Sequence, residues 1–155
     1  MNDKKRAVYL HGLESSQGGK KVEHMRLDHN VYAPNMDYKQ PGLFEKTLEK
    51  VKELQPKLLI GSSMGGYFAY QIATHTGIPV LLFNPALHSR GFQPTGVTTG
   101  SHIVKGEIVL GRSDKVIPPW KTLRILKQAI EAGELVVHKE SYGHRTPFNK
   151  FIAYL

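Results

Sequence analysis

The chain has 155 residues, a hydrophobic content of 40%, no cysteine and a formal net charge of +8. This length predicts a single domain over residues 1–155. The absence of cysteine excludes a disulfide framework and thiolate chemistry, and no apolar stretch of the sequence approaches the roughly 18 residues that span a bilayer. The apolar run after the basic N-terminus is too short for a signal peptide, so we expect a cytoplasmic protein without a membrane partner.

The positive charge raises the question of nucleic-acid binding, for which lysine and arginine would gather on one face. Along the sequence they are scattered, mostly on the polar faces of expected helices, and no nucleic-acid motif is present. We therefore expect no nucleic-acid partner, since such a domain would show a steeply salt-dependent affinity for DNA or RNA. The charge is interpreted as a contribution to solubility, with steering of anionic substrates as a further role.

Six short apolar runs alternate with helical patterns along the chain. The runs show little polar alternation, as in the strands of a parallel sheet that is covered on both faces. The expected strands are residues 7–10, 30–33, 57–60, 79–83, 107–110 and 134–138, and the expected helices are residues 18–28, 42–54, 64–76, 118–131 and 146–155. This alternation predicts an α/β fold of about six mostly parallel strands flanked by helices.

The third expected strand runs directly into Gly61-Ser62-Ser63-Met64-Gly65, a G-x-S-x-G pattern. In hydrolases this pattern forms a strained turn between a strand and a helix, and the turn exposes the serine hydroxyl. The two glycines suit a turn in which a Cβ would clash with nearby backbone. The alternative is a glycine-rich turn without chemistry. The strand before and the helical pattern after the motif favour Ser63 as a nucleophile.

Residues 84–106 interrupt the alternation of strands and helices. They are rich in proline, glycine, serine and threonine, which predicts a long loop with at most one short helical turn. Long loops in compact domains are usually functional or mobile.

A serine nucleophile needs a base, and the base needs an orienting acid. In an open α/β sheet both are expected at the carboxyl ends of strands. Of the four aspartates only Asp114 lies downstream of Ser63, directly after the fifth expected strand. Its alternative role is an Asx-turn or a helix N-cap. Three glutamates are weaker rivals because they start strands or point outward: Glu107, Glu134 and Glu140.

The base is predicted to be His144, which follows the sixth expected strand. The chain has eight histidines, and His88 and His102 in the irregular segment compete with it. The order Ser63, Asp114, His144 is the order that α/β-hydrolases use. A purely structural role for His144 is the alternative.

An oxyanion that forms during attack needs preorganised N–H donors. We expect one donor at Met64, at the start of the helix after the nucleophile, and the other at Leu13, in the loop after the first strand. Gly12 lets this loop turn close to a substrate, and His11 and Gly12 are expected to bind it. The alternative for His11-Gly12 is a simple strand-ending turn.

Together these motifs resemble the α/β-hydrolase superfamily and, more narrowly, the small, lid-poor esterases of the YqiA type. The motifs that carry the resemblance are Tyr9-Leu10-His11-Gly12-Leu13-Glu14-Ser15-Ser16 with Lys20 nearby, Gly61-Ser62-Ser63-Met64-Gly65-Gly66-Tyr67, Phe83-Asn84-Pro85-Ala86, Asp114 and Gly143-His144. The resemblance implies a single-domain α/β-hydrolase fold with strand order 2-1-3-4-5-6. It also implies carboxylester hydrolysis through an acyl-enzyme, with no cofactor and no metal.

The chain departs from this family pattern in two places. It is short around residues 84–106, where larger relatives insert a lid, so we expect a reduced or absent lid and a shallow pocket for small esters. Arg145 stands beside the base where an apolar residue is more usual, and it would either bind a substrate carboxylate or face solvent.

The sequence therefore predicts a serine hydrolase that cleaves small carboxylic esters, with thioesters as further candidates, and that exists as a monomer or weak homodimer. The alternative is a catalytically silent binding or interaction module on the same scaffold. A pure scaffold has no physical reason to retain the serine, aspartate and histidine together.

Overall fold

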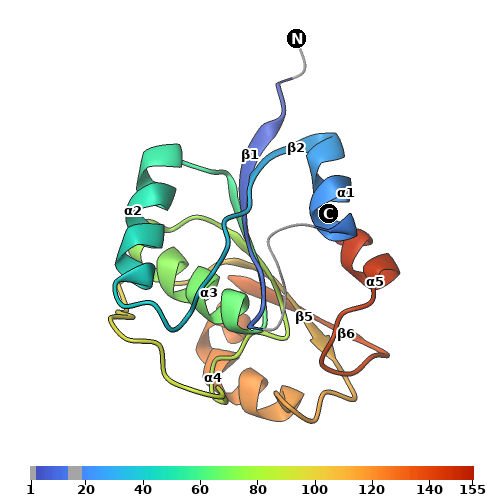
Figure 1. The fold of residues 1–155 in the computed structure, drawn as a ribbon. Coiled ribbons are helices and arrows are strands. Elements are labelled where there is room, and N and C mark those ends of the chain that lie inside the picture. Colours follow the sequence, from blue (N-terminus) through green and yellow to red (C-terminus); the bar gives the residue numbers. More distant parts are fainter. Residues whose placement is uncertain (1–2, 14–18) are drawn as a thin grey trace.

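The computed structural model describes residues 3–13 and 19–155, which form a six-stranded sheet with helices on both faces (Figure 1). The strands are β1 (Lys5–Leu10), β2 (His29–Tyr32), β3 (Leu58–Ser62), β4 (Val80–Phe83), β5 (Gly106–Gly111) and β6 (Leu135–Glu140). The helices are α1 (Lys20–Asp28), α2 (Leu43–Leu54), α3 (Met64–Thr76), α4 (Pro119–Glu131) and α5 (Phe148–Ile152). No helix in these two ranges is long and apolar enough to cross a bilayer.

Each predicted strand and helix is present, with ends that differ by a few residues. The largest difference is the last helix, which was expected over residues 146–155 and is limited to Phe148–Ile152. Pro147 precedes this helix with an extended backbone (φ −60°, ψ 150°), and a residue before proline is itself kept out of the helical region. The helix therefore begins only after the proline.

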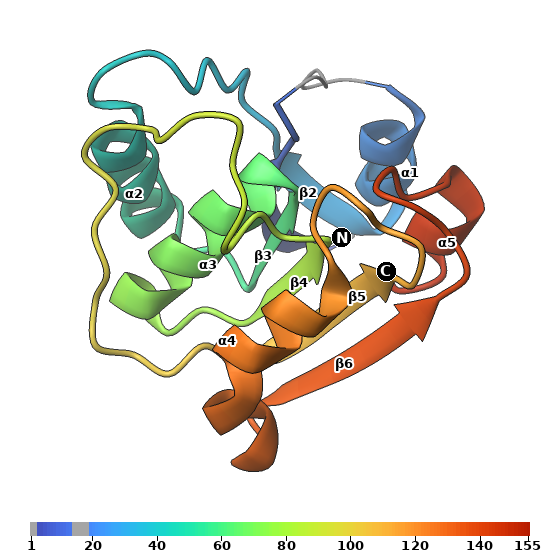
Figure 2. The ribbon, with the colours of Figure 1, turned by 90° about the horizontal axis from the view of Figure 1, so that it is seen from below.

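The strand order is β2-β1-β3-β4-β5-β6, and all neighbouring strands are parallel. This confirms the expected fold class and order. The order reverses between β1 and β3, and in such sheets sites form beyond the carboxyl ends of the strands at this point. In Figure 1, β1 runs downward from the N-terminus, so the view from below in Figure 2 looks onto these carboxyl ends.

Two apolar layers bury the sheet. Val8 and Leu10 belong to the layer that also contains side chains of α2, α3 and α4, whereas Ala7 and Tyr9 belong to the layer of α1 and α5. Figure 1 shows these helices on opposite sides of the sheet. Because alternate residues of a strand point to opposite faces, both sets must be apolar. This explains why the strand sequences show little polar alternation.

The connection between β4 and β5 is long and irregular, as predicted. Residues 84–105 contain no helix or strand, and Figure 2 shows this loop passing α2 and α3. The backbone N–H of His102 donates to Thr74 O at the end of α3, and the Gly100 N–H donates to the Thr74 hydroxyl. The segment is thereby anchored along the side of the fold, and it places no helical layer over the carboxyl ends of the strands.

Two glycines permit the tight turn between β3 and α3. A Cβ on Gly61 would lie 2.4 Å from Gly65 O, and a Cβ on Gly65 would lie 2.0 Å from Leu10 O at the end of β1. Both obstacles are backbone atoms, which cannot rotate away. The close approach of β1 to the start of α3 therefore requires glycine, as the sequence pattern indicated.

Replacing Gly65 with alanine is expected to lower the free energy of unfolding by about 1–3 kcal/mol, because the added methyl group overpacks a backbone contact. Gly91→Ala is the control, since a Cβ there meets only Leu13 Cδ2 at 4.0 Å. Urea unfolding of both variants measures the difference. Equal midpoints for the two variants would contradict the steric role of Gly65.

Candidate active site

Ser63 occupies the turn between β3 and α3 in an unusual backbone conformation, with φ 52° and ψ −116°. Positive φ is rare for a residue with a side chain and persists only where the surroundings impose it. Here the Ser63 N–H donates to Phe83 O at 3.0 Å, and the Ser63 carbonyl accepts from Ala86 at 2.9 Å and Tyr67 at 3.1 Å. The neighbouring strand β4 and the loop after it therefore hold the turn in place.

The three expected catalytic side chains lie within hydrogen-bond distance in series. Ser63 Oγ is 3.0 Å from His144 Nε2, and His144 Nδ1 is 2.9 Å from Asp114 Oδ2. An ionised carboxylate only accepts hydrogen bonds, so Nδ1 carries the proton and Nε2 is free to accept from the serine hydroxyl. The structure thus brings together residues that are 51 and 81 positions from Ser63 along the chain.

The Asp114 carboxylate is completely buried and has donors on both oxygens. Oδ1 accepts from the Val116 N–H at 2.9 Å and the Ile117 N–H at 2.8 Å, while Oδ2 faces His144. A buried carboxylate needs such donors to offset its lost hydration. The turn role that was the alternative for Asp114 is therefore realised through Oδ1, and it leaves Oδ2 aimed at the imidazole.

Neither competing histidine contacts Ser63 or Asp114 in the hydrogen bonds of the described residues. His88 Nδ1 lies 2.7 Å from the Ser89 hydroxyl, and its Nε2 lies 3.3 Å from that of Thr122. Burial lowers the pKa of His88. His102 is exposed and its ring lies beside Gly77, at the end of α3 remote from Ser63.

The competing glutamates also lie away from His144. Glu107 pairs with His138 at 3.0 Å, and Glu140 accepts from Lys150 at 3.0 Å. Glu134 is exposed just before β6.

The two expected oxyanion donors are backbone N–H groups near Ser63. The Met64 N–H begins α3, the Leu13 N–H follows β1, and neither has an acceptor in the part of the chain that the structure describes. Both residues line the same cavity as Ser63. The tight contact of Gly65 with Leu10 and His11 backbone brings the β1 loop next to the start of α3.

His11 is placed behind this loop, contrary to the expectation that it binds substrate. Its exposure is 2%, and it does not line the cavity. The Met36 N–H donates to His11 Nε2 at 2.9 Å, so the other ring nitrogen carries the proton and donates to Gly12 O at 2.7 Å. His11 therefore orients the loop that contains Gly12 and Leu13.

The cavity beside Ser63 has a volume of about 500 Å³, within the range of small-molecule sites. Ser63, His144 and the expected Gly12 and Arg145 line it, and apolar side chains form much of its wall. The apolar lining residues are Leu13, Met64, Ala86, Val116 and Ile117.

Residues 14–16, part of the motif that carried the family resemblance, lie outside the described residues. Among the described side chains no group of three or more histidines and carboxylates is arranged to hold a metal ion.

Asn84 belongs to the site, although its sequence position predicted no chemical role for it. It follows β4 with a φ of 43° and is 1% exposed. Its side-chain Nδ2 donates to His144 O at 2.7 Å and to Gly143 O at 3.3 Å, and its Oδ1 accepts from the Gly111 N–H at 2.7 Å. One amide therefore joins the ends of β4 and β5 to the loop that carries the imidazole. The signal in the sequence was an amide directly after a buried strand.

Asn84→Asp is expected to destabilise the protein by about 1–3 kcal/mol at neutral pH, because a carboxylate would face two carbonyl oxygens that have lost their donor. The unfolding midpoint in urea measures this effect. Asn149→Asp, the same change at an exposed position of α5, serves as the control. A loss of stability shared by both variants would argue against the joining role of Asn84.

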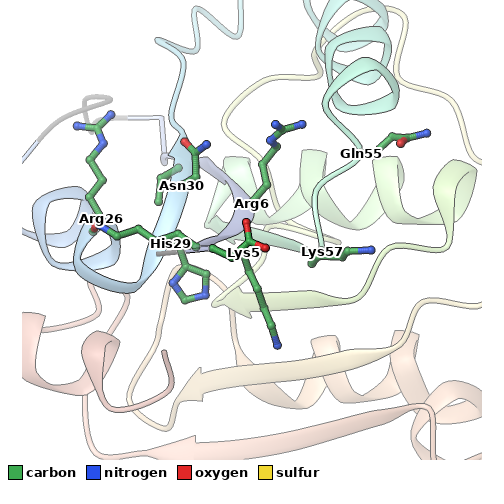
Figure 3. A pocket seen from close by; sticks show the side chains of 10 residues that line it. Lys5, Arg6, Arg26, His29, Asn30, Gln55 and Lys57 are labelled. Carbon is green, nitrogen blue, oxygen red and sulfur yellow. The ribbon is translucent and has the colours of Figure 1, made fainter. Parts of the chain in front are cut away.

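A second hollow of about 710 Å³ lies at the opposite, amino edge of the sheet (Figure 3). It is lined by Asp3, Lys4, Lys5, Arg6, Arg26, His29, Asn30, Val31, Gln55 and Lys57. Five cations thus gather where the sequence suggested scattered charge, because the starts of three strands meet at this edge. Lys4 Nζ donates to Arg26 O in the last turn of α1 at 2.7 Å, and Arg6 donates to Leu54 O at the end of α2. Both cations therefore stabilise carbonyl groups at helix C-termini.

Comparisons with known proteins agree with this fold and place the chain in a family. A model of the uncharacterised protein family UPF0227 matches residues 6–94, more than half of the chain, and the chain belongs to this family. The match contains the β1 loop, Ser63 and Asn84, and it ends before Asp114 and His144. It confirms the resemblance to the YqiA type that the motifs indicated. No curated protein matches the sequence significantly.

Solved structures with the same fold include a proposed hydrolase, a lipase and an esterase. A proposed hydrolase of the α/β superfamily from Xanthomonas campestris is 20% identical, with a TM-score of 0.72 over 96% of this chain and 95% of that one. A monoacylglycerol lipase from Paleococcus ferrophilus is 15% identical, with a TM-score of 0.69 over 90% and 86%. An esterase from Pyrococcus furiosus is 15% identical, with a TM-score of 0.73 over 92% and 75%. These similarities identify the α/β-hydrolase fold.

Proposed function

We propose that this protein is a serine hydrolase that cleaves small carboxylic esters, with thioesters as further candidate substrates. The observation that carries the proposal is the hydrogen-bonded series of Ser63, His144 and Asp114, which lies beside a cavity of about 500 Å³. The esterases and the lipase among the structural neighbours support the same class of reaction.

In the proposed reaction Ser63 Oγ attacks the ester carbonyl carbon, and His144 Nε2 accepts the hydroxyl proton. The carbonyl oxygen becomes an oxyanion that the Met64 and Leu13 N–H groups stabilise. The C–O bond to the alcohol then breaks, and His144 returns the proton to the departing oxygen. Water, deprotonated by His144, hydrolyses the acyl-enzyme and restores Ser63. Asp114 keeps Nδ1 protonated and stabilises the imidazolium in both steps.

Ser63→Ala should abolish hydrolysis of 4-nitrophenyl acetate and covalent labelling by a fluorophosphonate probe, because the attacking oxygen is gone. Mass spectrometry of the labelled wild-type protein should place the probe on Ser63. Ser101→Ala, an exposed serine in the β4–β5 loop, is the control and should be labelled at the wild-type rate. Full labelling of Ser63→Ala would refute the proposal, and so would an inert wild-type protein.

Asp114→Asn should lower kcat by about 10³- to 10⁴-fold while the protein remains folded, because an amide favours the wrong imidazole tautomer. Steady-state kinetics with 4-nitrophenyl acetate measure the loss, and circular dichroism checks the fold. The Val116 and Ile117 N–H groups keep an acceptor at the amide oxygen. An activity within tenfold of wild type would show that Asp114 does not orient His144.

A further inference from the structure

The active-site cavity contains a lysine that the reaction above does not use. We propose that Lys21 binds a negatively charged group of the substrate, so that the preferred esters are anionic. This inference rests on the proposed esterase function and assigns its substrate class.

Lys21 lies on α1 and lines the same cavity as Ser63 and His144. Its side chain is partly buried, with Nζ 5.0 Å from the centroid of the Phe151 ring. Within residues 3–13 and 19–155 its ammonium group has no carboxylate partner and no hydrogen-bond acceptor. Other lysines are exposed, as Lys20 is, or bonded, as Lys150 is to Glu140.

The described surroundings of Lys21 bury its ammonium group in part but provide no anion and no hydrogen-bond acceptor for it. Burial lowers the pKa of Lys21, which means that the site disfavours the ammonium form relative to water. The Phe151 ring attracts the cation from one side, but an ammonium group has three N–H donors that a ring face does not satisfy. An anionic ligand would accept hydrogen bonds from these donors and would stabilise the ammonium form of Lys21.

The rest of the cavity also favours an anion. No aspartate or glutamate is among the described residues that line it, since Asp114 is buried behind His144. Arg90 lines the cavity as well, but its guanidinium already donates to Ala86 O, Leu87 O and Gln93 Oε1 and stacks on Tyr67. Arg90 and Arg145, which also lines the cavity, therefore add positive potential, whereas the Lys21 ammonium has no acceptor among the described residues.

The ligand consistent with these features is a small ester that carries a carboxylate or comparable anionic group on its acyl or alcohol part. With the ester carbonyl at Ser63, a charge elsewhere on the same molecule can contact Lys21 across the cavity. A hydrogen bond to a charged group changes a binding constant by about tenfold or more. This is sufficient to set the preference between two esters of equal shape.

The test compares anionic and neutral esters of matched length. The first pair is mono-4-nitrophenyl adipate and 4-nitrophenyl hexanoate, with the charge on the acyl part. The second is 4-acetoxybenzoate and its methyl ester, with the charge on the alcohol part. For each pair, kcat/KM is measured for the wild type, Lys21→Met, Lys21→Gln, Lys21→Arg and Lys20→Met. Thermal melting shows which variants are folded.

In at least one pair, removing the charge of Lys21 should lower the anionic-to-neutral ratio of kcat/KM by about tenfold or more, the value of one charged hydrogen bond. The ratio is the readout, because an effect of the substitution on the shape of the cavity changes the rates for both esters of a pair alike. Lys21→Arg should retain most of the preference, and Lys20→Met, the same change at the exposed neighbour, should leave the ratio unchanged.

Ratios that do not change in either pair when Lys21 is replaced would overturn the inference. An equal drop in Lys20→Met would also overturn it, because the effect would then come from general surface charge. Hydrolysis of the neutral esters tests the proposed function separately, so a protein that cleaves them without charge preference refutes only the role of Lys21.

Discussion

The hydrogen bond between the buried Asp114 carboxylate and the His144 imidazole is the interaction on which the site depends. Asp114 is held by two backbone N–H groups that follow it in the chain, so its free oxygen has one fixed direction. That direction sets the imidazole tautomer, and the tautomer decides whether Nε2 can accept the Ser63 proton. The turn after β5 thus determines, through His144, which hydrogen bond the Ser63 hydroxyl can make.

The loops that carry these three side chains are kept together by backbone approach. Gly65 allows β1 to contact the start of α3, and Gly111 allows the end of β5 to meet the His144 loop, where an added Cβ would lie 2.3 Å from Gly143 O. Asn84 joins the same loops through its side-chain amide. Positive φ at Ser63 and Asn84 is the conformational cost of this arrangement, and the packed parallel sheet supplies the stability that offsets it.

The sequence was sufficient to predict the sheet, because apolar runs indicate buried strands. It was also sufficient to predict that Ser63, Asp114 and His144 lie together, because the carboxyl ends of parallel strands lie at one edge of the sheet. It was not sufficient for His11, since a histidine next to glycine has the same sequence signal whether it faces a ligand or supports a loop. The hydrogen bonds of its ring with Gly12 O and with the Met36 N–H, 25 residues away, show that the ring is bonded to backbone. The grouping of cations at the amino edge was not predicted for a related reason. The starts of β1, β2 and β3 are far apart in the sequence, so the sequence does not show that they are neighbours.

A substrate at this site could be selected by the shape of the cavity or by its charge. Residues 84–105 contain no helix or strand, and Ala86, Ser89, Arg90 and Gly91 of this segment form part of the cavity wall, so this segment contributes a loop wall and no helical lid. Shape selection requires enclosure, whereas a charge acts over a distance of about 8–10 Å at ordinary ionic strength. At the amino edge Lys4 and Arg6 are bound to helix carbonyls, but Lys21 at the carboxyl edge has no such partner among the described residues. If Ser63 is the nucleophile, as we propose, the Lys21 ammonium in the same cavity can distinguish an anionic ester from a neutral one.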